Sequence, residues 1–380
     1  MAVNFKIHFE WIDGFVNVDN EFKNKIKRKI LFISPVYKFA KKVGITSVHI
    51  GYFLNRSNAF ISIKNLIKIL KSSKINLRIA EKHIIGYRDA NSTAIYKIKF
   101  PYYYTPVDMR IISVLVGDGY IHHKNKSLRW IQNDTNPLRE LLFSRFNYFK
   151  LGKTKSTQIV IPAFFRKISC YALNLEPNEL KTYKIIQRSF NLPTEYKLAL
   201  LVAVIEDEAN IDPKNYSGIN LRMSDERIIS SLKKLCDLLN YKTSHVIKYK
   251  NRGTYGENEM YKLNILSEGI TKFGYDILDF EKKFGKNTSL WKKRADLLKR
   301  WEICIGKKAQ KNKEGLRLHK EIIDIFKKDQ TLSLTEISSK IEIDKVRVSW
   351  ILKNMYKRGE IRRIKRGTYK YDGVYMSKKL

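Results

Sequence analysis

Residues 111–119 of this 380-residue chain read IISVLVGDG, and residues 201–209 read LVAVIEDEA. Each stretch is an apolar run that ends near an acidic residue, Asp118 in the first and Glu208 in the second. A helix C-terminus carries partial negative charge, so a carboxylate there costs a few tenths to about 1 kcal/mol. The sequence therefore predicts that another group compensates these acids, and a metal ion is one candidate.

The two runs belong to an internal duplication. When the two runs are aligned on their last residues, Asp118 and Glu208 occupy the same position, and they lie 90 residues apart in the chain. Each run also has a small residue five positions before its acid, Ser113 in the first and Ala203 in the second. The sequence LRWIQNDTNPLRELLFSRFNYF after the first run corresponds to INLRMSDERIISSLKKLCDLLNY after the second. Small residues let two helices pack closely, so a pseudo-twofold axis along the pair would bring both carboxylates to one end of it.

Two neighbouring carboxylates repel and raise each other's pKa, and a divalent cation between them reverses that penalty. Hard oxygen ligands select Mg²⁺, or Mn²⁺, which keeps several waters and binds phosphate oxygens. Such a site is suited to phosphodiester hydrolysis, in which the metal positions and activates water.

Composition agrees with a nucleic-acid partner. The chain has 74 Lys and Arg against 37 Asp and Glu, a net charge of +37, which favours binding to a polyanion over the alternative of a Lys-rich proteome bias. The three cysteines lie far apart and form no zinc-ligand or disulfide pattern, and no apolar run approaches about 18 residues. We therefore expect a cytoplasmic, nucleoid-associated protein.

Residues 30–78 have the pattern of a helix-turn-helix. Apolar residues recur at helical spacing in VYKFAKKV, Gly44 ends that helix, and Thr46-Ser47 can cap the next one. The stretch resembles the phage-repressor type of helix-turn-helix domain; the alternative is an ordinary small helical bundle. The candidate DNA-binding residues on the second helix are Ser47, His49, Tyr52, Asn55 and Arg56.

The C-terminal residues 316–380 predict three helices followed by a basic hairpin that turns at Gly367, which is the winged-helix plan. Ser333 or Thr335 opens the second helix and Asp344 caps the third. A winged helix used for protein contacts is the alternative. The candidate DNA-binding residues here are Lys345, Arg347, Arg362, Arg363, Lys365, Arg366 and Lys370.

The pair IISVLVGDG and LVAVIEDEA resembles the LAGLIDADG (dodecapeptide) homing endonucleases in their single-chain, two-motif form. FPYYYTPVDMRIISVLVGDGYI also resembles the lead-in of archaeal members. The resemblance implies an α+β fold, a pseudo-twofold duplication of αββαββα halves whose strands lie in the DNA major groove. We expect a helix-turn-helix domain and connector at 1–107, the halves at 108–195 and 196–304, a linker at 305–315 and a winged helix at 316–380.

The same resemblance implies that Asp118 and Glu208 are metal ligands, and that a basic residue lies near the metal, for which Lys286, with Lys283, is the nearest match. The second motif departs from the family pattern because it has Glu208 for Asp, Ala209 for Gly, and Asp207 where a small uncharged residue is usual. Asp207 would add a third negative charge beside the axis.

The predicted function is site-specific cleavage of double-stranded DNA by a monomer with internal pseudo-twofold symmetry, using Mg²⁺ or Mn²⁺. The main alternative is a non-catalytic transcription regulator, as in sporulation regulators that join a degenerate LAGLIDADG domain to a helix-turn-helix. An activity on intron RNA and a pair of core helices with accidental terminal acids are further alternatives. Both acids being present favours cleavage, because a protein that only binds DNA has no need of two repelling carboxylates against it.

Overall fold

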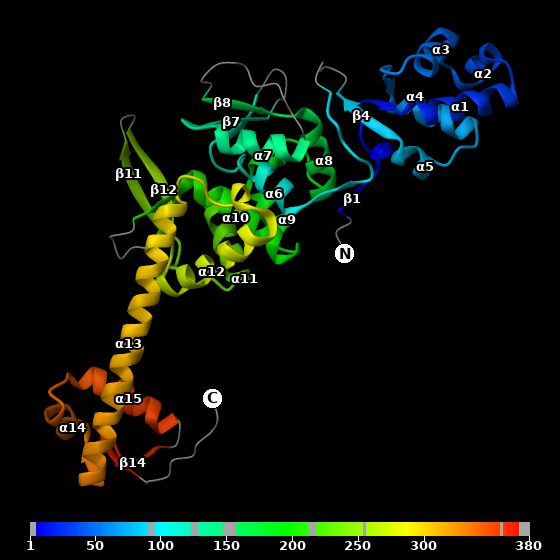
Figure 1. Cartoon of the computed structure of the whole chain (residues 1–380). Coiled ribbons are helices and arrows are strands. Elements are labelled where there is room, and N and C mark those ends of the chain that lie inside the picture. The colour runs from blue at the N-terminus through cyan, green and yellow to red at the C-terminus, as the bar shows by residue number, and fades with distance from the viewer. Residues whose placement is uncertain are drawn as a thin grey trace. The chain divides into compact units, whose positions relative to one another are not determined.

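The computed structural model describes residues 5–89, 95–122, 128–146, 157–212, 218–253, 256–357 and 360–371. The chain divides into two compact units, Met1–Trp301 and Glu302–Leu380. It contains helices and several small sheets, and every strand pairing among the described residues is antiparallel (Figure 1). The fold class is therefore α+β, as predicted.

The first unit begins with a small helical domain. Its helices are α1 (Asn20–Ile33), α2 (Val36–Val43), α3 (Ser47–Asn55), α4 (Ile63–Ser72) and α5 (Leu77–Lys82). Gly44, with a φ of 67°, ends α2, and the Thr46 side chain accepts a hydrogen bond from the His49 N–H to begin α3. The predicted helix-turn-helix geometry is therefore present at these residues.

Short strands that the sequence did not indicate accompany these helices. β2 (Phe15–Val18) lies between β3 (Ile61–Ser62) and β4 (Ile84–Arg88), and β1 (Lys6–Ile7) pairs with β5 (Tyr102–Tyr103). Segments of two to five residues show too few alternations to be recognised from a pattern of period two.

The second half of the duplication has the complete αββαββα order. Its elements are α10 (Thr194–Glu208), β9 (Ala209–Ile211), β10 (Ile219–Met223), α11 (Glu226–Leu238), β11 (Ile247–Gly253), β12 (Gly256–Ile265) and α12 (Ser267–Phe284). The Asp225 side chain accepts from the Arg227 N–H and so caps α11. A short η3 (Lys286–Thr288) follows α12.

The first half has the corresponding elements α6 (Pro106–Ser113), β6 (Gly119–Ile121), β7 (Leu128–Ile131), α7 (Asn136–Phe146), β8 (Gln158–Ile161) and α8 (Ala163–Leu173). Residues 147–156, where a further strand of that order would fall, lie outside the described residues. η2 (Glu179–Lys181) and α9 (Tyr183–Ser189) then lead to α10. Helices α6 and α10 pack against each other with Ser113 and Ala203 fully buried, which agrees with the close helix pairing expected from these small residues (Figure 1).

The second unit is built on a winged-helix plan. It contains α14 (Leu334–Lys340), α15 (Lys345–Lys357), and β13 (Thr331–Ser333), β14 (Ile361–Lys365) and β15 (Thr368–Tyr371) in the order β13-β15-β14. Ser333 forms a capping box with Glu336, and Asp344 accepts from the Arg347 N–H. Leu318, Ile322, Phe326, Val348 and Leu352 are among the buried residues of its core.

The linker predicted at 305–315 is instead helical, because α13 (Arg294–Lys328) spans those residues without a break. The segment IGKKAQKNKEG contains mainly Lys, Ala, Gln and Glu, which favour helix, and each of its two glycines costs only about 1 kcal/mol. The change in composition at this point therefore occurs within one continuous helix.

Candidate catalytic and nucleic-acid-binding site

The ends of the two motifs meet beyond α6 and at the end of α10. Glu208 ends α10, but α6 ends at Ser113, so Asp118 lies in the turn before β6 and not at a helix C-terminus as predicted. A Cβ atom added to Gly117 would lie 2.5 Å from the Asp207 Cβ, so only glycine permits this approach. The Asp118 N–H also donates to the Asp207 Oδ2 at 3.4 Å. Asp207, which the sequence marked as an irregular residue, therefore fits because the matching position of the first motif has no side chain.

Asp118 is exposed and Glu208 is partly buried at this junction. Partial burial of its carboxyl group nevertheless raises the pKa of Asp118 above its ordinary value. Burial also raises the pKa of Glu208, and the negative charge of Asp118 raises it further. The charge of Asp118 therefore disfavours the ionisation of Glu208, a situation that a bound cation would relieve.

Three lysines counter this negative charge. Lys293, Lys292 and Lys181 each oppose the increase in the Asp118 pKa, and Lys293 and Lys181 do the same for Glu208. The Lys293 Nζ donates to the carbonyl of Ile205 at 3.0 Å, just before the second acid. Burial lowers the pKa of Lys293, while four nearby carboxylates act to raise it.

Gln132, directly after β7, connects two of these charged groups. Its amide nitrogen donates to the Asp118 Oδ2, and its Oε1 accepts from the Lys292 Nζ at 2.7 Å. The two halves of the duplication therefore both contribute to a series of hydrogen bonds that runs from Asp118 through Gln132 to Lys292.

The lysine assignment made from the sequence requires correction. Lys286 lies in η3 and is not among the cations that act most strongly on the two acids, and Lys283 pairs with Glu195 at 3.3 Å. The structure places Lys292 and Lys293 there instead, a few residues further along. All four lysines lie in FEKKFGKNTSLWKKR, and spacing alone does not distinguish them.

Glu206 fixes the segment that bears these lysines. It is only 5% exposed, and its carboxylate accepts from the N–H of Trp291 at 2.9 Å and from that of Lys292 at 3.1 Å. The corresponding position of the first motif is Val116, so this attachment exists on one side only. Neither Glu206 nor Gln132 had a signal in the sequence, because each acts through a tertiary contact.

Asp207 points into the helix pair. Burial raises its pKa to about 7, opposed by the fully buried Arg110, whose guanidinium lies 4.1 Å from the ring centroid of Trp291. The Trp130 indole donates to the Asp207 Oδ2 at 3.3 Å, while Oδ1 is buried without a hydrogen-bond partner. The expected third negative charge is therefore only partly present at neutral pH.

The donor set is consistent with a magnesium-like ion. Asp118 and Glu208 supply hard oxygen atoms, and an ion that keeps several waters and shares phosphate oxygens needs only one or two protein carboxylates. Across the described part of the chain, no cluster of three or more His, Cys, Asp or Glu side chains could hold a metal by itself. An ion bound by Asp118 and Glu208 alone would need water or substrate oxygens to complete its coordination.

The sheets of the two halves each have one outer face, which is mixed in the first half and polar in the second. Strand register and burial place the apolar residues of each sheet against the helices and the remaining ones outward. The outward set of the first half is Tyr120, Arg129, Ile131, Gln158 and Val160. The outward set of the second half is Asn210, Arg222, Lys262 and Asn264; Asn220 lies on the same face but is only 4% exposed.

The two outer faces differ in chemistry. The first has exposed apolar side chains at Ile131 and Val160. The second has the amide or cationic groups of Asn210, Arg222, Lys262 and Asn264. Arginine and lysine recognise guanine, asparagine and glutamine recognise adenine, and apolar groups contact the thymine methyl. Such faces are suited to direct contact with different base sequences.

The predicted residues of the helix-turn-helix, Ser47, His49, Tyr52, Asn55 and Arg56, are all exposed. The Arg56 guanidinium stacks over Tyr52, with 5.1 Å to the ring centroid, and Asn55 accepts from Lys27 at 3.0 Å. An exposed Val48, which the sequence analysis did not select, lies on the same helix.

In the second unit, Lys345, Arg362, Arg363, Lys365 and Arg366 are exposed and Lys370 is partly buried. Arg347 pairs with Glu314 at 2.6 Å, so part of its charge is compensated within the unit. The exposed face of α15 also includes Val346 and Trp350, which had not been predicted.

Comparison with known proteins gives little guidance. No protein-family profile matches the chain, and no curated protein matches it either. Among solved structures, the crystal structure of full-length DUF199/WhiA from Thermatoga maritima aligns over 67% of this chain and 91% of its own, with 13% identity and a TM-score of 0.31. Within the described residues, no helix is long and apolar enough to cross a membrane.

Proposed function

We propose that this chain is a DNA-binding protein of the LAGLIDADG type that cleaves double-stranded DNA at Asp118 and Glu208 with Mg²⁺ or Mn²⁺. The observation that carries the proposal is the approach of Asp118, in the turn between α6 and β6, to Glu208, at the end of α10, with Lys293 acting on both acids. A net charge of +37 and the polar side chains on the outer faces of both sheets support DNA as the partner.

In this proposal each group has a distinct role. Asp118 and Glu208 hold the ion, which when bound would polarise the scissile phosphate and activate water. Lys293 and Lys292 stabilise the negative charge that develops on the phosphate, and Gln132 fixes the orientation of Asp118. One chain supplies both halves of the site, so the proposed protein acts as a monomer and has no need of a membrane.

A plasmid assay tests this function. Supercoiled plasmids containing a library of genomic inserts are incubated with the full chain, with and without Mg²⁺, beside the Asp118→Asn/Glu208→Gln protein. We expect linear product that depends on the metal and is lost in the variant. Specific retention of one insert, with no cutting in Mg²⁺ or Mn²⁺, would reject the enzyme.

The second candidate is a transcription regulator that binds DNA on the same fold without cutting it. Lys293 favours it, because an ammonium group that interacts with Glu206, Asp207, Glu208 and Asp118 compensates these acids without any metal. A regulator would bind one operator equally well in EDTA, and would do so after Asp118→Asn/Glu208→Gln replacement. The nuclease would keep the binding and lose only the cleavage.

A further inference from the structure

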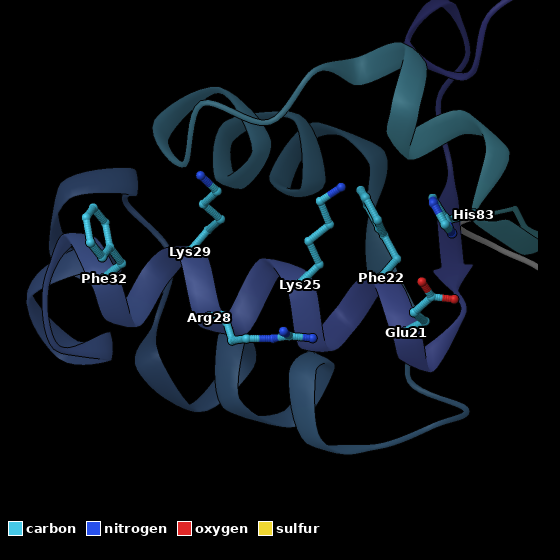
Figure 2. Close-up of a pocket in the computed structure, with 7 residues that line it drawn as sticks. All are labelled: Glu21, Phe22, Lys25, Arg28, Lys29, Phe32 and His83. Atoms are coloured by element: carbon cyan, nitrogen blue, oxygen red, sulfur yellow. The ribbon is translucent and has the colours of Figure 1, made fainter.

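A groove on α1 lies away from every site described so far. It is lined by Glu21, Phe22, Lys25, Arg28, Lys29, Phe32 and His83 and encloses about 470 Å³. Figure 2 shows Lys25, Lys29 and Phe32 projecting from one side of α1, with Phe22, Glu21 and His83 near its N-terminal end. We call this surface the α1 groove.

The α1 groove faces away from the candidate DNA-binding helix α3. Residues 22, 25, 29 and 32 are spaced by three and four positions and so share one face of α1. The opposite face contacts the end of α3, where the Lys23 Nζ donates to the Arg56 carbonyl at 2.8 Å and the Lys27 Nζ donates to the Asn55 side chain at 3.0 Å. A DNA segment that contacts α3 therefore cannot contact the α1 groove as well, because the two surfaces lie on opposite faces of α1.

The charge of the groove selects an anionic occupant. Among the described residues, no ion pair is formed by Lys25, Arg28 or Lys29, so three cations stand against the single carboxylate of Glu21. A second copy of this chain, with its net charge of +37, would be repelled. A polyanion is attracted, since each neutralised phosphate releases bound counterions.

An exposed aromatic ring at one end of the groove selects an unpaired strand over a duplex. Phe32 is 88% exposed, which is unusual for so large an apolar side chain, whereas Phe22 at the other end is fully buried and stacks on His83 with 4.5 Å between ring centroids. A volume of about 470 Å³ is within the range of small-ligand sites. An unpaired base can stack on an exposed aromatic ring, whereas the bases of a duplex are already stacked on each other.

We propose that the α1 groove binds single-stranded nucleic acid, with a base stacked on Phe32 and its phosphates on Lys25, Arg28 and Lys29. This proposal is independent of cleavage at Asp118 and Glu208. It assigns the N-terminal domain two nucleic-acid surfaces on opposite faces of α1, one for duplex at α3 and one for a single strand.

Fluorescence anisotropy with the full chain tests the proposal, using labelled oligo-dT, oligo-U and a duplex of the same length. We expect Phe32→Ala to weaken single-strand binding about tenfold, the effect of removing one aromatic stacking partner, and to leave duplex binding unchanged. Phe32→Trp should retain binding. Leu31→Ala is the control, because Leu31 is the neighbouring exposed apolar residue, at 54%, and lies on another side of the helix.

The phosphate contacts have a matched control as well. Arg28→Ala/Lys29→Ala should reduce the slope of log affinity against log salt for the single strand by about 0.7 for each phosphate that the variant no longer neutralises. Lys282→Ala/Lys299→Ala removes the same charge from exposed positions elsewhere in the first unit and should change the slope less. Similar binding of oligo-dT and oligo-U would show that the sugar is not recognised, and a preference would identify which strand is the ligand.

Two results would overturn the proposal. One is an equal effect of Phe32→Ala and Leu31→Ala, which would show that no base stacks on Phe32. The other is an equal loss of duplex and single-strand binding in the Phe32 and Arg28/Lys29 variants, which would make the groove a binding surface for the duplex backbone. Circular dichroism of each variant verifies that the chain remains folded.

Discussion

Asp207 shows how one residue can be essential for packing and still affect the charge of the site. Its pKa is about 7 in the folded chain against an ordinary value of 3.8. Between pH 3.8 and about 7 the folded protein holds a proton on Asp207 that the unfolded chain lacks. The stability that this proton contributes is complete at low pH and is lost as the pH rises through about 7.

This shift predicts the effect of Asp207→Asn. Without divalent metal, the free energy of unfolding of the native chain should fall between about pH 4 and about pH 7, and the variant should lack this part of the decrease. Urea unfolding of both proteins in EDTA across that range measures the difference. Parallel pH profiles would show that Asp207 titrates normally.

Glu206 predicts a second outcome at the scale of one residue. Glu206→Ala leaves the N–H groups of Trp291 and Lys292 without their charged acceptor and should destabilise the chain by about 2–4 kcal/mol. Because the same hydrogen bonds position Lys292 and Lys293, the cleavage rate should fall more than DNA affinity does. Glu206→Gln, which keeps an acceptor oxygen, should recover part of both losses. A variant that unfolds less readily, or that loses affinity and cleavage equally, would contradict this role.

At the scale of the elements, the close approach of the turn after α6 to the last turn of α10 depends on Gly117 opposite Asp207. Gly117→Ala should cost about 1–3 kcal/mol, since its Cβ has no space at 2.5 Å from that of Asp207. In an Asp207→Gly background the same substitution should cost much less. A double-mutant cycle by thermal unfolding measures this coupling. Additive effects would show that residues 117 and 207 are not in contact.

The elements also show what the sequence could predict. The register between the two motifs predicted that Asp118 and Glu208 correspond, because a duplication conveys a tertiary relation within the chain itself, but only Glu208 lies at a helix end. Lys293 and Gln132 could not be found in this way, since their approach to the acids depends on how the end of the second half and strand β7 fold back. The short β2, β3 and β4 were missed because segments of two to five residues show too few alternations to be recognised. The helical path through 305–315 was missed because two glycines and a run of lysines there are also typical of a linker.

At the scale of the whole molecule, positive charge is present in both units. The hairpin of the second unit contributes Arg362, Arg363, Lys365 and Arg366, all exposed. Replacing these four with alanine should reduce the slope of log affinity for duplex DNA against log salt by about 0.9 for each phosphate that is no longer neutralised. Titrations at several salt concentrations measure the slope. An unchanged slope would mean that the winged helix binds protein and not DNA.

Asp118 and Glu208 are proposed to act together on the phosphate after DNA is bound. The most direct test is the cleavage rate on a bound target duplex, measured for the native chain, Asp118→Asn and Glu208→Gln at protein concentrations that saturate binding. We predict metal-dependent cutting by the native chain and loss of cutting in both variants at undiminished affinity. Saturated binding by the native chain without cutting, or cutting that survives both substitutions, would contradict this joint role.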